Sequence, residues 1–251
     1  MNSMKSTYFR SAVLVVSGLA LTVAIYAYKW LHTIQNAQTY YDNYQEALAN
    51  ASRVETLILR NQSLQSLPTD IGRMGNLKVL NLGRNALTAL PEQVGQLENL
   101  EELILEGNQL SQLPEALFSL PKLRVLDLNG NRFARFPEGL CELPALQALY
   151  LAGNQLGTLP ARIGNLKNLE VLDLAENQLE TLPDELAGLA HLKKLDVYHN
   201  RLTRVPEPVF HLAHLQELIL EDNPLSAPAK AALVKFNQSP GGQPPAGSGR
   251  N

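Results

Sequence analysis

The chain has 251 residues, of which 45% are apolar, with a formal net charge of −3 and a pI near 6.0. This balance argues against general affinity for nucleic acid, which needs clustered Lys and Arg to displace counterions. A single cysteine, Cys141, excludes an internal disulfide framework and any cysteine-based zinc site, and we interpret it as a tolerated residue on the outer side of the molecule. We expect a protein with no cofactor and no bound metal.

The N-terminal region reads as a membrane segment. Residues 1–11 are basic, with Lys5 and Arg10, and residues 12–28 contain no charge before Lys29. This length is low for a membrane-spanning helix and slightly above a usual signal-peptide core. The poor cleavage site after it and the aromatic and basic border favour a single-pass anchor over a cleaved signal of a secreted protein. The positive charge before the run predicts that the rest of the chain lies outside the cytoplasm.

Two segments are expected to cover the ends of the central region. Residues 29–53 carry no repeat motif and are predicted to form a helical N-terminal cap. Residues 227–238 contain Pro228 followed by an apolar stretch, which predicts a C-terminal cap helix. The tail 239–251 is rich in Gly and Pro and is predicted to be disordered.

Residues 54–226 consist of a 23-residue sequence motif that is repeated eight times. Prolines recur every 23 residues from Pro68 to Pro206. Asparagines keep the same step, at Asn85, Asn108, Asn131, Asn154, Asn177, Asn200 and Asn223. A fixed period of roughly 20–50 residues indicates a stacked repeat whose apolar face is buried by its neighbours.

Each repeat reads LxxLxLxxNxLxxLPxxhxxLxx, in which h is Ile, Leu or Val. Alternate leucines such as Leu80 and Leu82 point one way, as a short strand requires, and the residues between them point the other way. The pattern resembles the leucine-rich repeat family. The resemblance implies an α/β fold: a curved solenoid with a parallel sheet on the concave face and short helical or irregular segments on the convex face. The buried Asn amides are predicted to bond backbone groups of adjacent turns.

The outward positions of the strands would form the concave face. They carry seven acids and two bases, a net charge of −5, with tyrosines near the centre. Tyr is favoured at binding surfaces, and carboxylates steer basic partners. An alternative is that the Asp residues, common at this position of the family, only keep the face soluble. The candidate partner-binding residues are Asn81, Glu102, Glu106, Asp127, Asn129, Tyr150, Asp173, Lys194, Asp196 and Tyr198.

No catalytic motif such as a nucleophile elbow, a phosphate loop or His-Glu-x-x-His is present, so an enzyme is not expected. His211 and His214 read as solvated residues rather than zinc ligands. The leading hypothesis is a membrane-anchored scaffold that binds a protein or peptide, with a basic or mixed apolar surface, outside the cytoplasm. One alternative is a surface structural or adhesion protein that binds glycan or cell-wall polymer. Another is an intracellular signalling scaffold resembling the Ras-associated leucine-rich repeat proteins.

Overall fold

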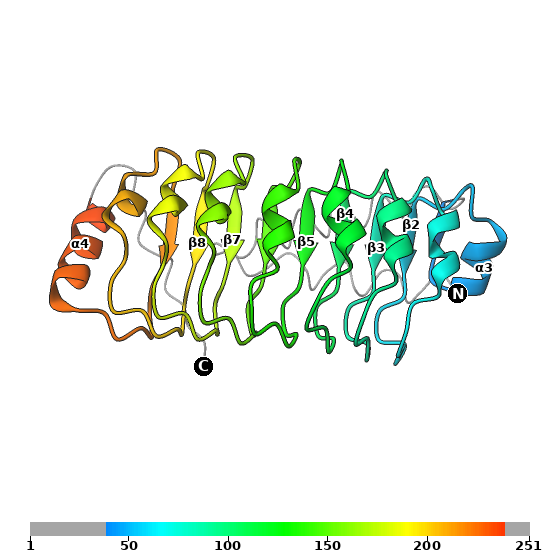
Figure 1. The fold of residues 1–251 in the computed structure, drawn as a ribbon, viewed down its shortest axis with the longest axis horizontal. Coiled ribbons are helices and arrows are strands. Elements are labelled where there is room, and N and C mark those ends of the chain that lie inside the picture. The colour runs from blue at the N-terminus through cyan, green and yellow to red at the C-terminus, as the bar shows by residue number, and fades with distance from the viewer. Residues whose placement is uncertain (1–38, 239–251) are drawn as a thin grey trace, which may run out of the picture. The chain divides into compact units, whose positions relative to one another are not determined.

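The structure, a computed structural model, describes residues 39–238 (Figure 1). The predicted segments 1–11, 12–28 and 239–251, and the first part of the cap 29–53, lie outside the described residues. Within residues 39–238, no helix combines the length and the apolarity that a membrane crossing requires.

Nine strands form one parallel sheet in which the spatial order follows the chain order. Because each strand pairs with the equivalent residues of the next repeat, Leu126 lies beside Leu103 on one side and Leu149 on the other. The predicted parallel sheet is confirmed. The strands are β1 (Tyr40–Tyr41), β2 (Thr56–Ile58), β3 (Val79–Asn81), β4 (Glu102–Ile104), β5 (Val125–Asp127), β6 (Ala148–Tyr150), β7 (Val171–Asp173), β8 (Lys194–Asp196) and β9 (Glu217–Ile219).

Short 3-10 helices form a second layer on one side of the sheet (Figure 1). Each follows a proline of the 23-residue series; Pro91, for example, is extended, with φ −73° and ψ 150°, and the helix begins at the next residue. Five residues are enough for little more than one turn, a length at which the 3-10 geometry is common. The helices are η1 (Thr69–Arg73), η2 (Glu92–Gln96), η3 (Glu115–Ser119), η4 (Glu138–Glu142), η5 (Ala161–Asn165), η6 (Asp184–Gly188) and η7 (Glu207–His211).

The core lies between these two layers. Leu80 and Leu82, the inward residues of the third strand's repeat, are fully buried, and Val94 of η2 packs in the same core. Phe133 and Phe136, which replace Leu in one repeat, are 0% and 6% exposed, so the core accommodates the larger rings. The apolar seam therefore runs the length of the stack instead of forming a globular centre.

Asparagine side chains join successive turns along one edge of the core. The Asn154 amide donates to the carbonyls of Leu128 and Leu151 at 3.0 Å, and its oxygen accepts the N–H of Phe133 at 3.0 Å. The equivalent asparagines, Asn85, Asn108, Asn131, Asn177, Asn200 and Asn223, make the same set of bonds. These side chains satisfy backbone groups that the turns leave without a partner.

The N-terminal end of the stack contains a strand as well as a helix. Strand β1 pairs with β2, and α3 (Tyr44–Ala49) follows, with the Asn43 side chain accepting the N–H of Glu46 at its start. The Tyr44 hydroxyl donates to the Asp70 carboxylate in η1, which ties α3 to the first repeat. The sequence predicts a helix through this region; the structure differs because pairing at residues 40–41 satisfies the open edge of β2.

The C-terminal end is covered by α4 (Ala227–Gln238). The Phe236 ring is buried and its centroid lies 6.0 Å from that of Phe210 in η7. This contact removes apolar surface of the last repeat from water. The exact limits of both caps and of the repeat region stay predictions.

Candidate functional site

The outward side chains of the strands, together with the residue two beyond each strand end, form the surface that we call the sheet face. The register places Asp127, Tyr150 and Asp173 side by side on β5, β6 and β7, and Asp196 next to Asp173 on β8. Tyr198 lies two residues beyond Asp196 on the same turn of the chain. The structure thus brings the central predicted residues into one row across four strands.

Four of these residues also have a structural role. The side-chain oxygen of Asn81 accepts the N–H of Gly83 at 2.9 Å. Asp127, Asp173 and Asp196 accept the N–H two residues ahead of them in the same way, each at 3.0 Å. Each side chain thereby closes an Asx turn that ends its strand. The sequence contained a signal for this turn-forming role. Asn81 and the three aspartates occupy the same repeat position, and what their side chains have in common is an acceptor oxygen.

The two cations predicted on the sheet face are both ion-paired. Arg60 lies 2.5 Å from the Glu106 carboxylate, and Lys194 lies 3.2 Å from Glu217. A third cation, Arg84, approaches Glu106 at 3.6 Å from the turn after β3. Two of the seven acids of the face are therefore neutralised locally, and the remaining carboxylates set its charge.

The Asp127 carboxyl group of this row has a pKa well above its usual range. Burial is the main cause and, together with the carboxylates of Glu106 and Asp173, raises this pKa to about 7, while the hydrogen bond from the Asn129 N–H acts in the opposite direction. A carboxyl group in such surroundings exchanges its proton near neutral pH. The charge of the central sheet face consequently depends on pH.

Not every predicted residue is equally accessible. Glu102 and Asp196 are 8% and 7% exposed, less than their outward direction predicts. Asn129 accepts the N–H of Ala152 at 2.6 Å and so links two turns of the chain. Tyr150 and Tyr198 are half-buried and offer ring surface among the carboxylates. The tyrosines are therefore the side chains of this row best suited to contact a partner.

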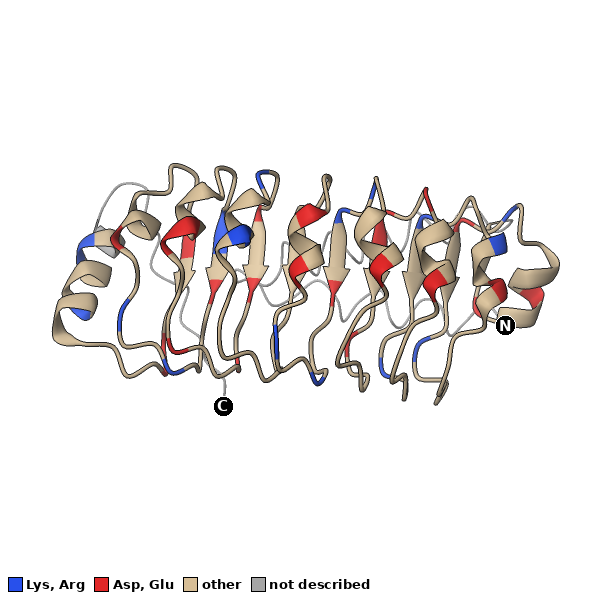
Figure 2. Ribbon diagram, in the orientation of Figure 1, with Lys and Arg blue, Asp and Glu red and all other residues tan. Residues whose placement is uncertain are grey.

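The helical layer is as acidic as the sheet face. The seven 3-10 helices contain eight acids and two arginines, a net charge of −6, and Figure 2 shows acids recurring along them. Acids near a helix start interact favourably with the N–H groups exposed there. Negative charge alone therefore does not distinguish the sheet face from the helical layer. The acids of the helices are Asp70, Glu92, Glu115, Glu138, Glu142, Asp184, Glu185 and Glu207.

Comparison with known sequences identifies the family. A family model described as "Leucine rich repeat" matches residues 52–110, and one described as "Leucine-rich repeat region" matches residues 113–229. The chain belongs to the leucine-rich repeat proteins. No curated protein matches it significantly over its sequence.

Solved structures of leucine-rich repeat proteins share the fold. Internalin C2 from Listeria monocytogenes is 28% identical with a TM-score of 0.65, over 75% of this chain and 80% of that one. The plant peptide hormone receptor RGFR1 in complex with RGF2 is 32% identical with a TM-score of 0.62, over 69% of this chain and 29% of that one. The ectodomain of GASSHO1/SCHENGEN3 from Arabidopsis thaliana, in complex with CASPARIAN STRIP INTEGRITY FACTOR 2, is 35% identical with a TM-score of 0.62, over 69% and 22%. This leucine-rich repeat chain spans less than a third of either plant receptor.

Within residues 39–238 of this leucine-rich repeat protein, the cysteine and the histidines belong to no cluster that could hold a metal ion. Cys141 lies in η4 and is only 5% exposed, so the interpretation that it lies on the outer side of the molecule is wrong. Its burial raises the pKa of the thiol to about 11. His191 and His214 stack with ring centroids 6.0 Å apart, while His211 lies 4.0 Å from Glu207. Among residues 39–238, no group of three or more His, Cys, Asp or Glu side chains could hold a metal ion.

Two further series of side-chain contacts between successive repeats, on the outside of the leucine-rich repeat stack, were not predicted from the sequence. Side chains directly before the strands form ion pairs between adjacent repeats: Lys78 with Glu55 at 3.0 Å, and Lys193 with Glu170 at 2.8 Å. Other side chains donate to a carbonyl 24 residues earlier, as Asn99 does to Gly75 at 2.8 Å. Asn76, Asn168 and His191 make the same contact. The signal was available, since these positions also repeat every 23 residues.

Proposed function

We propose that this protein is a non-enzymatic scaffold that binds a protein or peptide on its sheet face. The observation that carries the proposal is the row in which Tyr150 lies between Asp127 and Asp173, with Asp196 next in the row and Tyr198 two residues beyond it. Rigid aromatic rings beside charged groups are typical of protein-binding surfaces. The similar plant receptor RGFR1, which is named as a peptide hormone receptor in complex with RGF2, supports the same class of partner.

The partner is expected to combine positive charge with apolar surface. Val125 and Val171 are partly exposed on the sheet face, on the same strands as Asp127 and Asp173. Carboxylates steer a basic partner and fix its register, whereas burial of the valines and tyrosines supplies most of the affinity. A partner with Lys or Arg next to aliphatic side chains meets both requirements.

A further part of the proposal concerns location. Residues 12–28 would anchor the protein in a membrane and hold the repeats outside the cytoplasm. The ectodomain of the plant membrane receptor kinase GASSHO1/SCHENGEN3 supports this location, because it is a leucine-rich repeat domain of a membrane protein. Protease added to intact cells should then digest the repeats, and their full protection would contradict the proposed orientation.

The test compares the two acidic faces. A sheet-face variant carries Asp127→Asn, Asp173→Asn and Asp196→Asn, which removes three charges while the amide oxygens still accept the turn N–H groups, as Asn81 does. A helical-face control carries Glu115→Gln, Glu138→Gln and Glu185→Gln, which removes three exposed charges from the other layer. A second sheet-face variant carries Tyr150→Ala and Tyr198→Ala.

The full-length proteins are cross-linked in the native host, purified and compared by mass spectrometry, after circular dichroism shows that each variant is folded. A partner captured by the wild type and the helical-face control, and lost from both sheet-face variants, supports the proposal. A partner that both sheet-face variants retain, and that the helical-face control loses, places the contact on the other layer and rejects it.

A further inference from the structure

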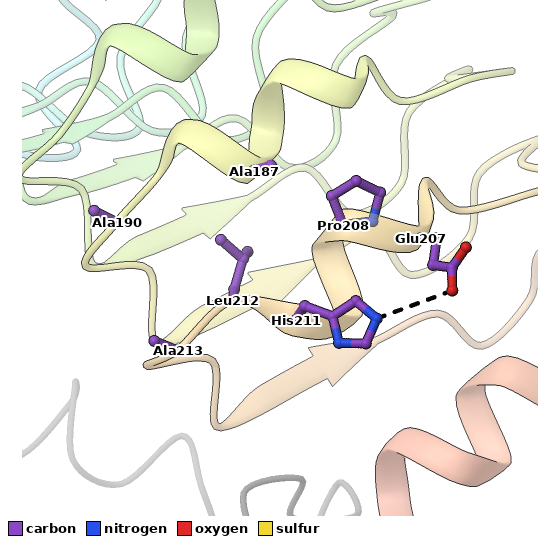
Figure 3. Close-up of a pocket in the computed structure, with 7 residues that line it drawn as sticks. All are labelled: Ala187, Ala190, Glu207, Pro208, His211, Leu212 and Ala213. Atoms are coloured by element: carbon purple, nitrogen blue, oxygen red, sulfur yellow. Dashed lines mark ion pairs between the residues drawn. The ribbon is translucent and has the colours of Figure 1, made fainter.

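The helical layer contains an open groove between η6 and η7, on the side opposite the sheet face. It has a volume of about 640 Å³ (Figure 3). Ala187 of η6 and Pro208 of η7 lie on its two sides, and Glu207 and His211 line it from η7 (Figure 3). The remaining lining residues are Ala190, Leu212 and Ala213. Apart from Glu207 and His211, every lining side chain is apolar, and most of the lining is exposed to solvent.

The groove exists because one repeat carries a small residue where two others carry phenylalanine. Ala187 occupies the repeat position of Phe118 and Phe210. The Phe118 ring leans onto the next helix, where a Cβ placed on Gly139 would come within 2.1 Å of it. Phe210 likewise points onward to α4, where its centroid lies 6.0 Å from that of Phe236. An alanine at this position leaves the equivalent space between η6 and η7 open.

Two other pairs of neighbouring helices are brought into close contact by a glycine at this repeat position. A Cβ on Gly95 of η2 would lie 2.4 Å from Ala116 of η3, and one on Gly164 of η5 would lie 2.3 Å from the Glu185 carbonyl of η6. The position of η6 that is equivalent to Gly95 and Gly164 is occupied by Ala187 instead of glycine. The η6–η7 junction therefore lacks the glycine-mediated contact that closes those junctions.

The two helices that form the groove carry negative charge, while a cation of the preceding repeat, Lys167, donates to the Gly188 carbonyl of η6 at 3.0 Å. Helices η6 and η7 contribute Asp184, Glu185 and Glu207, and neither helix contains Lys or Arg. His211 lies 4.0 Å from Glu207 and offers a cation only when protonated. An apolar floor with the Glu207 carboxylate at its rim complements an apolar side chain flanked by positive charge.

We propose that the η6–η7 groove is a second interaction site, which binds an aromatic side chain flanked by Lys or Arg on a partner protein. The aromatic ring packs against Ala187, Pro208 and Leu212, and a flanking cation approaches the Glu207 carboxylate. Burial of the ring supplies the affinity, because such side chains remove a large apolar area from water. This site is independent of the sheet face, so either can fail without the other.

The alanines of the chain provide a direct readout. The full-length protein is labelled with ¹³C at alanine methyl groups and titrated with the peptide acetyl-Arg-Trp-Arg-amide while methyl resonances are recorded. Ala187, Ala190 and Ala213 report on the groove, and Ala148, Ala152 and Ala175 report on the sheet face. The control peptides are acetyl-Glu-Trp-Glu-amide and acetyl-Arg-Gly-Arg-amide. We expect saturable chemical-shift changes that are confined to the groove alanines. The apparent affinity for acetyl-Arg-Trp-Arg-amide should be at least tenfold higher than for either control peptide.

Two variants separate the ring from the charge. Ala187→Phe should fill the groove, as Phe118 fills the space between η3 and η4. It should weaken binding of acetyl-Arg-Trp-Arg-amide by about tenfold or more, since burial of one aromatic ring contributes that much affinity. Ala161→Phe, at an exposed position of η5, is the matched control and should change binding less than twofold. Glu207→Gln should weaken binding of the basic peptide several-fold without altering the packing.

The outcomes decide the proposal. Shifts that move to the sheet-face alanines, or equal responses to the three peptides, overturn it. Binding that survives Ala187→Phe in a folded protein also overturns it. If Ala187→Phe proves unfolded by circular dichroism, the decision falls to Glu207→Gln: loss of affinity there supports the proposal, and unchanged affinity rejects it.

Discussion

The substitution Asn154→Ala removes one of the seven asparagines that recur every 23 residues, and it tests whether their side-chain amides hold successive repeats together. Asn154 is 7% exposed and lies in the middle of the stack. Its oxygen accepts the Phe133 N–H at 3.0 Å, and its amide donates to Leu128 and Leu151. The substitution removes these three bonds and a longer one, at 3.3 Å, to the Ala152 carbonyl, but leaves the backbone in place.

The magnitude follows from what each group loses. The Leu128 carbonyl still accepts from Asn131, and the Leu151 carbonyl still accepts from Asn177, so each keeps one partner. The Phe133 N–H keeps none, and an unsatisfied buried donor costs about 1–3 kcal/mol. Adding the net loss of two further hydrogen bonds, about 0.5–1.5 kcal/mol each, gives a destabilisation of about 2–6 kcal/mol.

The assay combines urea denaturation with native-state hydrogen exchange. The matched control is Asn165→Ala in η5, where the side chain is exposed and bonds to no residue of the described range 39–238. The control should change the free energy of unfolding by less than about 0.5 kcal/mol. In Asn154→Ala the Phe133 amide should exchange faster relative to the Leu156 amide, which keeps its own bond to Asn177.

The reasoning fails if Asn154→Ala is no more destabilising than Asn165→Ala. It also fails if the Phe133 amide keeps its protection while the protein as a whole is destabilised. In that case the ladder amides would be space-filling residues, and the cost would arise from packing alone.

Three other predictions concern the caps, the sheet face and the core. Tyr44→Phe removes the hydrogen bond to Asp70 and should cost about 1.5–3 kcal/mol, visible as earlier loss of protection in α3 by hydrogen exchange. Because the folded-state pKa of Asp127 is raised from 3.8 to about 7, the native state binds the extra proton in this window, and stability should fall as pH rises through it. Asp127→Asn should abolish this slope in urea titrations at different pH values. Leu149→Ala, in a fully buried central position, should cost about 2–5 kcal/mol, and Leu225→Ala in the last repeat less; equal costs would contradict additive stacking.

The fold could be predicted because its determinants are local and repeated. Leu80 and Leu82 alternate as a strand requires, and the asparagines recur at one spacing, so each repeat fixes its own turn and its contact to the next. Strand β1 could not be predicted in this way, since Tyr40 and Tyr41 match no repeat and form a strand only because β2 offers an open edge.

The candidate site was predicted by direction but not by accessibility. A strand pattern tells which side Glu102 and Asp196 point to, and both do lie on the sheet, yet each is less than 10% exposed because of its surroundings in three dimensions. The η6–η7 groove was missed for the opposite reason. It depends on a side chain that is small, and Ala187 becomes informative only when the rings of Phe118 and Phe210 are seen in equivalent spaces.

The acids of the central row can now be weighed between structure and function. The Asx turn at the end of each strand needs only an acceptor oxygen, and Asn81 shows that an amide supplies it. Asp127, Asp173 and Asp196 make the same turn with a group that also carries charge. At Asp127 that charge is unfavourable to the fold, since burial and neighbouring carboxylates raise its pKa to about 7. A charge that the turn does not require, and that the fold disfavours, fits the basic partner that we propose for the sheet face.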